Sequence, residues 1–441
     1  MAMVVKNNMS AISTLNTLNK NSSALSKSLQ KVSSGMKINS AADDASGYAI
    51  SERMRVQIRG LDQANSNTQN GTSMMKVAEG AVSSTVDILK TLKEKVINAA
   101  NDSNTDSDRA TIQKELDQSI DQINDNANVT FNGKYLVDGS KNAAVTQTTT
   151  AMTNESLNST TEWTTNLTAM TDRNGNSLNI NSTYSISVSF VNEGTTYTTS
   201  MQIGTNGLDD LLTKSAIGGG STVAISAYMK SSGSGSIIGK DIAGDTVYTA
   251  DRGNALTIQA AKSGVAGQIS GVTFAVTNTQ GAEQKSINAI LDNFSESIRA
   301  QNTSKDNAIS LQIGTKANQS IKVGLTDMRA EALGLQSSTG ATIQIGTQKQ
   351  ANAAINVLDN AVQKALDQQT TIGSVESRLE YTSSNLTTAS ENVQSSESTI
   401  RDADMAKEMT EYTKNNVLLQ AAQSMLSQAN QNSSSVLSLL Q

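Results

Sequence analysis

Apolar residues recur in heptads near both ends of this chain, and this repeat restricts the possible fold more than any other feature. Residues 47–99 carry one repeat, which is regular in its second half at Met75, Val82, Leu89, Leu92 and Val96. Residues 351–403 carry a repeat of similar length, at Leu358, Ile372, Leu379, Leu386 and Val393. Steps of three and four place such residues on one helix face, and about 50 residues form a helix of roughly 80 Å. The two repeats therefore predict an antiparallel coiled-coil rod.

Shorter repeats lie outside the rod, at the two chain ends. The N-terminal repeat comprises Leu15, Leu18, Leu25, Leu29, Val32 and Met36. The C-terminal repeat comprises Leu418, Ala422, Met425, Ala429, Val436 and Leu439. We expect the two segments to pair, but a single two-helix seam leaves apolar flanks such as Ile12, Val417 and Leu440 uncovered. Neighbouring subunits would have to bury them, so these repeats are candidate polymerisation seams, and we expect both ends to become ordered only on assembly.

Gly35, Asp43, Asp44 and Gly47 lie between the N-terminal repeat and the rod. Paired carboxylates can bind a metal or act as acid and base. Aspartate is also favoured at the start of a helix, where the backbone N–H groups are unpaired. We favour this second interpretation, with the glycines at a joint between two rigid helices.

The middle of the chain, residues 141–300, shows β-strand rather than helical periodicity. Strands are predicted around 184–190, 197–203, 223–229 and 272–276, with a short helix near 207–215. Residues 141–182 are predicted to be a loosely structured surface segment, and residues 218–239 a loop. A helix at 106–128 and a hairpin at 311–325 complete the pattern. The predicted fold is thus mostly α: a long antiparallel helical coiled coil formed by both chain ends, with a β-rich outer domain inserted as one or two subdomains.

The composition argues against an enzyme. The 441 residues include no His, no Cys and no Pro, which removes the commonest general base, thiol nucleophiles and most transition-metal ligands. Asp172 and the pair Asp209–Asp210 lack the spacing of a calcium loop and are interpreted as a turn and a helix start. A net charge of −6 points to neither nucleic acid nor an anionic membrane as a partner. No cofactor and no metal are expected.

Neither a signal peptide nor a membrane span is predicted. The first residues, MAMVVKNNMSAISTLN, contain no apolar stretch of the required length. No run of about 18 apolar residues occurs elsewhere. We therefore expect either a cytoplasmic protein or one exported by a route that reads no cleavable signal.

Several segments carry a resemblance to bacterial flagellins. Residues 32–55, VSSGMKINSAADDASGYAISERMR, resemble the N-terminal signature of that family, and residues 398–441 resemble its C-terminus. FNGKYLVDG at 131–139 and the segment 310–335 resemble its inner hairpin regions. The resemblance covers about residues 1–140 and 305–441. It implies terminal helices of a filament core at 1–43 and 398–441, a helical rod with β-hairpins at 44–140 and 301–397, and a variable surface domain at 141–300.

The same resemblance implies a function in motility. Flagellins polymerise helically into the extracellular filament of the bacterial flagellum. They leave the cell unfolded through the flagellar type III export system and fold at the distal tip. The implied partners are further copies of the chain, the flagellar cap, hook-associated proteins and an export chaperone at the C-terminus.

The resemblance also implies contact with the host flagellin-sensing Toll-like receptor. The receptor-competent motif has an Arg, a Leu four residues later and a Glu in the following helix. Here Glu115 fits the Glu, but Thr91 stands in place of the Arg and Lys95 in place of the Leu. Because a lysine replaces an apolar contact, we predict weak receptor activation. The alternative is that these positions simply face solvent.

Three other functions are weighed against the filament subunit. A hook–filament junction protein shares the terminal helices, but the intact signature and the length favour the filament. A flagellin with a zinc protease in its outer domain requires His-Glu-x-x-His, and the chain has no His. A coiled-coil adhesin outside the flagellum would predict a signal peptide.

Overall fold

The computed structural model describes residues 8–218, 221–231, 235–250 and 252–439. The side chains of Ser221, Ser433 and residues 436–439 lie outside this description. The chain forms two compact units. The first comprises Met1–Gln69, Gln312–Gln319 and Tyr381–Gln441, and the second comprises Asn70–Leu311 and Ser320–Glu380. Two long helices contribute residues to both units.

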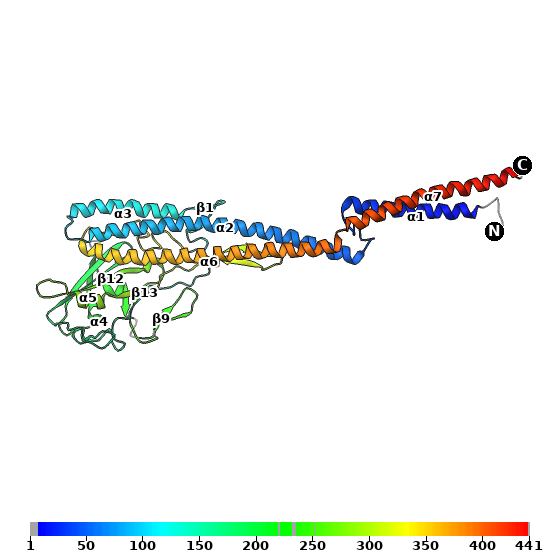
Figure 1. Ribbon diagram of the computed structural model, residues 1–441. Helices are drawn as coiled ribbons and strands as arrows, with labels where there is room; N and C mark the ends of the chain where they lie inside the picture. The colour runs from blue at the N-terminus through cyan, green and yellow to red at the C-terminus, as the bar shows by residue number, and fades with distance from the viewer. Residues whose placement is uncertain (1–7, 219–220, 232–234, 251, 440–441) are drawn as a thin grey trace. The chain divides into compact units, whose positions relative to one another are not determined.

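Long helices occupy both ends of the chain, as predicted (Figure 1). They are α1 (Met9–Ser34), α2 (Ala45–Ala99), α3 (Asp106–Ala127), α6 (Gln348–Arg401) and α7 (Met405–Leu439). The bounds of α2, α3 and α6 agree with the periodic segments of the sequence within a few residues, whereas α1 and α7 begin well before the first repeat residues, Leu15 and Leu418. The mostly helical fold class with a β-rich middle is therefore confirmed.

Helices α2 and α6 run antiparallel. In the first unit, Ser390 Oγ lies 3.1 Å from Asp62 Oδ1. In the second unit, Lys93 forms an ion pair with Asp359. Within the first unit, Glu52 also pairs with Arg401, so residue numbers rise along α2 as they fall along α6. Apolar side chains close the contact in the first unit at Leu61, Ala64 and Leu386.

Helix α3 begins and ends at the predicted local signals. Thr105 Oγ1 accepts a hydrogen bond from Asp108 N, and Asp108 Oδ2 accepts one from Thr105 N, which completes a capping box. After the helix, β1 (Thr130–Phe131) pairs with β2 (Lys134–Tyr135). The turn between them places Asn132 at φ 49° and Gly133 at φ 72°, as a two-residue hairpin turn requires.

The β-rich middle contains two principal sheets, both in the second unit. The five-stranded sheet has the order β12-β4-β5-β6-β7 and the four-stranded sheet the order β13-β3-β11-β8. The first consists of β4 (Ser185–Asn192), β5 (Thr195–Gln202), β6 (Ser215–Gly218), β7 (Ser221–Ala224) and β12 (Ile269–Thr277). The second consists of β3 (Ala151–Asn154), β8 (Met229–Ser231), β11 (Leu256–Ala260) and β13 (Phe294–Ile298).

Smaller elements connect and flank these sheets. Two further hairpins are β9 (Ile237–Lys240) with β10 (Thr246–Tyr248), and β14 (Ile309–Gln312) with β15 (Ser320–Val323). Short helices are α4 (Leu208–Leu212) and α5 (Lys285–Leu291), and the 3-10 turns are η1 (Leu167–Ala169), η2 (Ile225–Ala227) and η3 (Val265–Gly267). The β14–β15 hairpin and α4 match their predicted positions.

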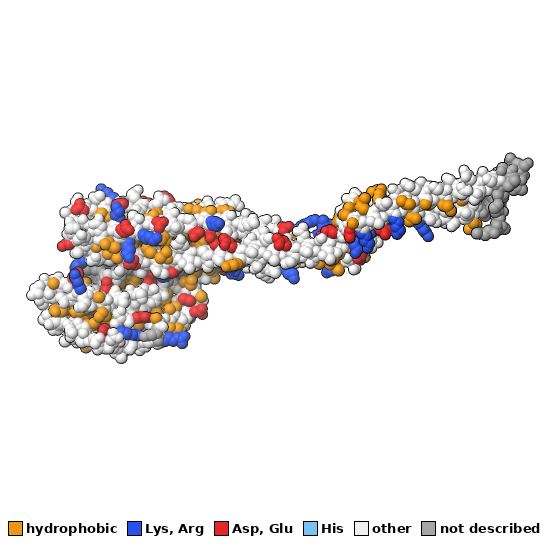
Figure 2. Space-filling model, viewed as in Figure 1, with side chains coloured by type: hydrophobic (Ala, Val, Ile, Leu, Met, Phe, Trp, Pro, Cys, Tyr) orange, Lys and Arg blue, Asp and Glu red, His pale blue; other side chains and the backbone are white. Residues whose placement is uncertain are grey.

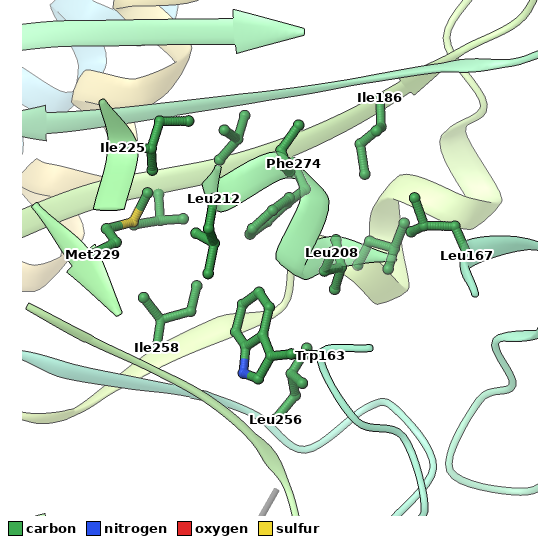
Figure 3. Close-up of a cluster of buried hydrophobic side chains, with 14 of the residues drawn as sticks. Trp163, Leu167, Ile186, Leu208, Leu212, Ile225, Met229, Leu256, Ile258 and Phe274 are labelled. Carbon is green, nitrogen blue, oxygen red and sulfur yellow. The ribbon is translucent and has the colours of Figure 1, made fainter. Parts of the chain in front are cut away.

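One hydrophobic core is shared by the two principal sheets. Figure 3 shows Trp163 among side chains from different strands and from α4, with Leu212, Ile258 and Phe274 around it. Trp163 is 4% exposed, and its indole N–H donates to the carbonyl of Thr257 at 3.1 Å. The apolar ring of this tryptophan is therefore buried in the core, and its N–H group has a hydrogen-bond partner there.

The prediction of a loose surface segment at 141–182 is wrong. This segment supplies β3, whose four residues are all buried, together with core residues such as Leu157 and Met170. Few apolar residues suffice because Asn and Thr side chains satisfy the backbone locally. Asn166 Oδ1, for example, accepts from the N–H of Thr168 at 3.3 Å.

The predicted strand at 223–229 is also wrong, as is the loop at 218–239. The 3-10 turn η2 interrupts the strand, so that β7 joins the five-stranded sheet and β8 the four-stranded sheet. Ile225 in η2 and Met229 in β8 are buried in the same core. The sequence predicts a single strand here because apolar residues alternate on both sides of η2, so that the alternation continues where the chain passes from one sheet to the other.

The β domain packs closely on α6 at Gly271 of β12. Its φ is 61°, and a Cβ there would lie 2.3 Å from the carbonyl oxygen of Ala353 and 2.8 Å from Val357. Only glycine combines this backbone conformation with so close an approach to a helix. Gly271 therefore holds β12 against the rod helix.

Charged side chains from β13, from the residue that follows it and from α6 lie together, and those of Glu296 and Lys364 are buried. Arg299 Nη1 lies 2.7 Å from Asp367 Oδ2, and Arg299 Nε lies 3.5 Å from Glu296 Oε2. Burial raises the pKa of Glu296 to about 7, against the opposing attraction of Arg299 and Lys364. Burial also lowers the pKa of Lys364 to about 8, and its Nζ donates to the carbonyl of Ala332 at 2.7 Å.

Glu296→Gln is expected to stabilise the protein at pH 8 and to leave its stability at pH 4 unchanged. The folded state binds the Glu296 proton more tightly than the unfolded chain, so stability falls as pH rises from about 4.5 to 7. Above pH 7 the folded wild type carries the full free-energy cost of a buried, ionised Glu296. Glu296→Gln removes this cost but also the attraction to Arg299, so the net gain is on the order of 1–3 kcal/mol. Urea unfolding at both pH values measures the effect. The exposed Glu283→Gln serves as control, and stabilisation that does not depend on pH contradicts the prediction.

Candidate assembly surface of the terminal helices

The terminal helices α1 and α7 form an antiparallel pair in the first unit. Asn21 Nδ2 donates to the carbonyl of Leu418 at 3.2 Å, and Asn415 Nδ2 donates to Ser28 Oγ at 2.9 Å. Further along, Lys31 Nζ lies 3.5 Å from Glu408 Oε1. Polar contacts therefore recur along this pair, where a coiled coil would place apolar residues.

The contact between α1 and α7 buries very little apolar surface. Among the side chains that the structure describes in these two helices, only Ser28 and Ala422 are less than 9% exposed, and both are small. A helix pair normally gains its stability from a buried apolar face rather than from helix propensity. This pair alone is consequently a weak one.

Four of the ten described residues of the predicted seam are exposed rather than buried in the pair. Leu18, Leu25, Val32 and Ala429 are half-buried and Ala422 is buried, but Leu15, Leu29, Leu418 and Met425 are 42–63% exposed. Met36 is half-buried and forms a β-bridge with Asp402, while the side chains of Val436 and Leu439 lie outside the described residues. This differs from the expected single seam because Asn21, Ser28 and Asn415 occupy alternate contact positions.

The four exposed seam residues belong to a larger set of exposed apolar side chains on the two terminal helices, where Figure 2 shows several groups of hydrophobic side chains. We call it the outer apolar surface, and its members are Met9, Ile12, Leu15, Leu29, Met405, Met409, Val417, Leu418 and Met425. Met405 and Met409 lie on the opposite face of α7 from Leu418 and Met425, so the exposed apolar residues are spread around this helix. So many large exposed apolar residues on two paired helices indicate positions that another molecule covers. The sequence anticipated two of the flank positions, Ile12 and Val417, and the third, Leu440, lies outside the described residues.

The joint between α1 and α2 consists of a helix end, a turn and a helix start, each stabilised by local hydrogen bonds or backbone geometry. Gly35 ends α1 at φ 70°, and Asp44 Oδ1 accepts from the N–H groups of Ser46 and Gly47, both at 3.0 Å. Asp43 Oδ2 accepts from the N–H of Ser40 at 3.1 Å, and this bond, the largest influence, lowers the pKa of Asp43. The two carboxylates thus serve as a turn and a helix cap.

Sequence reasoning missed Arg401, which lies at the same joint. Its side chain is 6% exposed, and its Nη1 lies 2.6 Å from Glu52 Oε1. An arginine at the end of a helix reads from sequence as a solvated cation that complements the helix dipole. No periodic signal distinguishes a buried arginine from that common case.

All of the predicted rod residues except the half-buried Val393 are buried in the structure. On α2, Met75, Val82, Leu89, Leu92 and Val96 are at most 1% exposed. On α6, Leu358, Ile372 and Leu379 are fully buried, Leu386 is 9% exposed, and Val393 packs against the cluster around Leu61. These side chains give the rod an apolar interior that the terminal pair lacks.

The three positions of the receptor motif lie near one another on α2 and α3. Lys95 Nζ lies 3.0 Å from Glu115 Oε1, so that the substituted lysine is paired with the one retained motif residue. Thr91 is exposed, and its hydroxyl donates to the carbonyl of Asp87 at 3.0 Å. The Glu115 carboxylate therefore already has a cationic partner, Lys95, in the protein's own chain.

Carboxylates elsewhere satisfy backbone groups. Asp172 Oδ1 accepts from the N–H groups of Asn174 and Asn176 at 2.9 and 2.7 Å, and Asp210 Oδ2 accepts from the N–H of Gly207 at the start of α4. Within the described ranges, no three acidic side chains gather as metal ligands do. In the same part of the chain, no helix combines the length and apolar character needed to span a bilayer.

A two-helix rod, an inserted β domain and terminal helices that a single copy leaves incompletely buried define a class of self-associating structural subunits. Comparison with known proteins agrees with this class. Residues 5–142 match the bacterial flagellin N-terminal helical region, and residues 355–440 match the bacterial flagellin C-terminal helical region. The chain belongs to the bacterial flagellin family.

Individual relatives cover nearly the whole chain. A flagellin of Clostridium tyrobutyricum is 34% identical over 97% of this chain and 99% of the relative. A flagellin of Bacillus subtilis is 29% identical over 99% of this chain and 100% of the relative. Among solved structures, a flagellar hook-associated protein 3 of Legionella pneumophila is 16% identical, with a TM-score of 0.33, over 78% of this chain and 97% of that chain.

Proposed function

We propose that this protein is the structural subunit that polymerises into the bacterial flagellar filament, outside the cell, for motility. The outer apolar surface carries this proposal, because two helices whose large apolar residues face solvent need further copies to cover them. Flagellin relatives that align end to end support the same assignment. The seam residues and the rod residues would then be the functional site, with no reactive side chain involved.

Seeded growth tests this function. Purified protein added to short filament fragments should extend them into long filaments that negative-stain microscopy resolves. Growth that stops after a few subunits would favour the alternative, a hook–filament junction protein. Absence of any extension at high protein concentration would count against both functions.

The proposal divides the chain by its role in the filament. Residues 1–43 and 398–441 would form the inner core, residues 44–140 and 301–397 the surrounding rod, and residues 141–300 the outer surface. The family assignment supports export through the flagellar type III system with folding at the filament tip. Partners would be the cap, the hook-associated proteins and an export chaperone at the C-terminus.

The terminal helices are expected to be cleaved first in the monomer and to be protected in the filament. Their pair buries only Ser28 and Ala422 among the described side chains, so local opening should cost little free energy. Limited proteolysis followed by mass spectrometry should remove both ends and leave a core near residues 45–395. Ends as resistant as that core in the monomer would refute the expectation.

Weak activation of the flagellin-sensing Toll-like receptor is expected, with a gain on restoring the motif. The double variant Thr91→Arg/Lys95→Leu supplies the missing cation and apolar contact and frees Glu115 from its ion pair. Its potency in receptor reporter cells should rise by about tenfold or more, as for restored hot-spot contacts. Lys90→Leu, at a nearby exposed position of α2, is the control. An unchanged dose response of the double variant contradicts the expectation.

A further inference from the structure

The joint must hold α1 and α7 at a fixed angle to the rod if copies of the terminal helices are to pack together. Helix α7 has 35 residues, so it is about 52 Å long. A tilt of about 10° at the joint would displace its far end by roughly 9 Å, which equals the distance between two packed helices. The outer apolar surface can meet its counterpart on another copy only if this angle varies by much less.

Backbone and side-chain contacts both fix this angle. The backbones of the two crossing chain segments form an antiparallel bridge between Met36 and Asp402. Lys37 N donates to the carbonyl of Arg401 at 2.6 Å, and Ala403 N donates to the carbonyl of Gly35 at 2.9 Å. These bonds join the segment after α1 to the segment between α6 and α7, but they reach neither α2 nor its side chains.

Ile38 is buried beside Gly47 at the start of α2, and Arg55 of α2 lies 3.8 Å from Glu397 of α6. The side chain of Arg401 adds the most enclosed polar connection to α2. Its guanidinium lies over the ring of Tyr48 at 5.3 Å, and Nη1 lies 2.6 Å from Glu52 Oε1 and 3.5 Å from Ser51 Oγ. The flat guanidinium of arginine can stack on a ring through its face and at the same time donate hydrogen bonds from its edge, which a lysine ammonium group cannot do. Arg401 is 5% exposed although its partner Glu52 is 40% exposed, so the contact is enclosed on one side only.

We propose that Arg401 is a positioning residue for filament assembly, because it locks the end of α6 to the first turns of α2 and so sets the direction of the terminal helices. The alternative is a contact that merely adds stability. The two roles predict different results. If Arg401 only adds stability, a solute that stabilises the folded state should restore filament growth; if Arg401 fixes the angle of the terminal helices, the same solute should not restore growth. This inference rests on the proposed filament function.

Seeded growth and a distance measurement test the proposal together. In Arg401→Gln, the protein concentration needed for growth from wild-type seeds should rise about tenfold or more, as expected for loss of a charged hydrogen bond and a stacked cation. Arg401→Lys, which keeps the charge but not the stacking, should be intermediate.

Trimethylamine N-oxide should restore the unfolding midpoint of Arg401→Gln without restoring growth. Lys90→Gln, which breaks an exposed ion pair with Asp87, should grow like wild type.

The distance measurement reads the joint directly. The chain has no Cys, so spin labels can be placed at Lys20→Cys on α1 and Arg59→Cys on α2, both exposed. Electron–electron resonance, in the monomer and in filaments diluted with unlabelled protein, should give a broader distance distribution for Arg401→Gln than for the labelled wild type. Equal widths, or growth of Arg401→Gln at the wild-type concentration, overturn the proposal. If wild type itself does not grow, the filament function fails, while the monomer distances still decide the role of Arg401.

Discussion

Replacing Leu418 and Met425 together by aspartate is expected to abolish filament growth without changing the unfolding of the monomer. Both side chains lie on the outer apolar surface, 42% and 63% exposed in the single copy. In the filament each would lose roughly 0.6–2 kcal/mol of apolar burial, because each is already partly buried in the single copy, and each carboxylate would in addition be desolvated without a partner. Sedimentation of polymer at increasing protein concentration measures the loss, and circular dichroism on heating measures the monomer.

The matched control for this double variant is Gln420→Asp on the same helix. Gln420 is exposed and polar, so it adds the same charge without removing apolar surface. Growth of this control should be impaired far less. If the double variant polymerises like wild type, the outer apolar surface is not the assembly surface, and the proposed site would have to be sought elsewhere.

Leu89→Ala is expected to destabilise the second unit by about 3–5 kcal/mol, because it leaves a cavity in a closely packed helix contact. Leu89 is completely buried on α2, within the repeat that predicted the rod. Urea unfolding monitored by circular dichroism gives the free energy. Ile97→Ala is the control, since Ile97 lies on the same helix but is 50% exposed. Similar losses for the two variants would show that burial in the rod does not determine stability.

Much of the helical part of the fold could be predicted from sequence, because its signals are local and repeated. A heptad repeat around Leu89 or Leu358 specifies both a helix and the face that it buries. Thr105 with Asp108 and Asn132 with Gly133 specify a helix start and a hairpin turn through their own side chains and backbone angles. Such features require no information about distant residues.

The β domain was less predictable because its burial is decided by distant contacts. Nothing local marks β3 as a buried strand, since Thr153 and Asn154 are also common in loops. Its burial comes from β11 and β13, which pair with it on either side from more than 90 residues away in sequence. The crossing of the chain between sheets at η2 has the same non-local origin.

The sequence by itself determined that both chain ends are helical, that the rod pairs antiparallel, and that the terminal segments carry apolar repeats too rich for one copy to bury. A helix period is a local property, and these conclusions follow from it. Only the tertiary structure decided which residues of each terminal repeat face outward, because that depends on where Asn21 and Asn415 bond across the pair. It likewise revealed the buried Arg401 at the joint, where residues 350 positions apart come into contact.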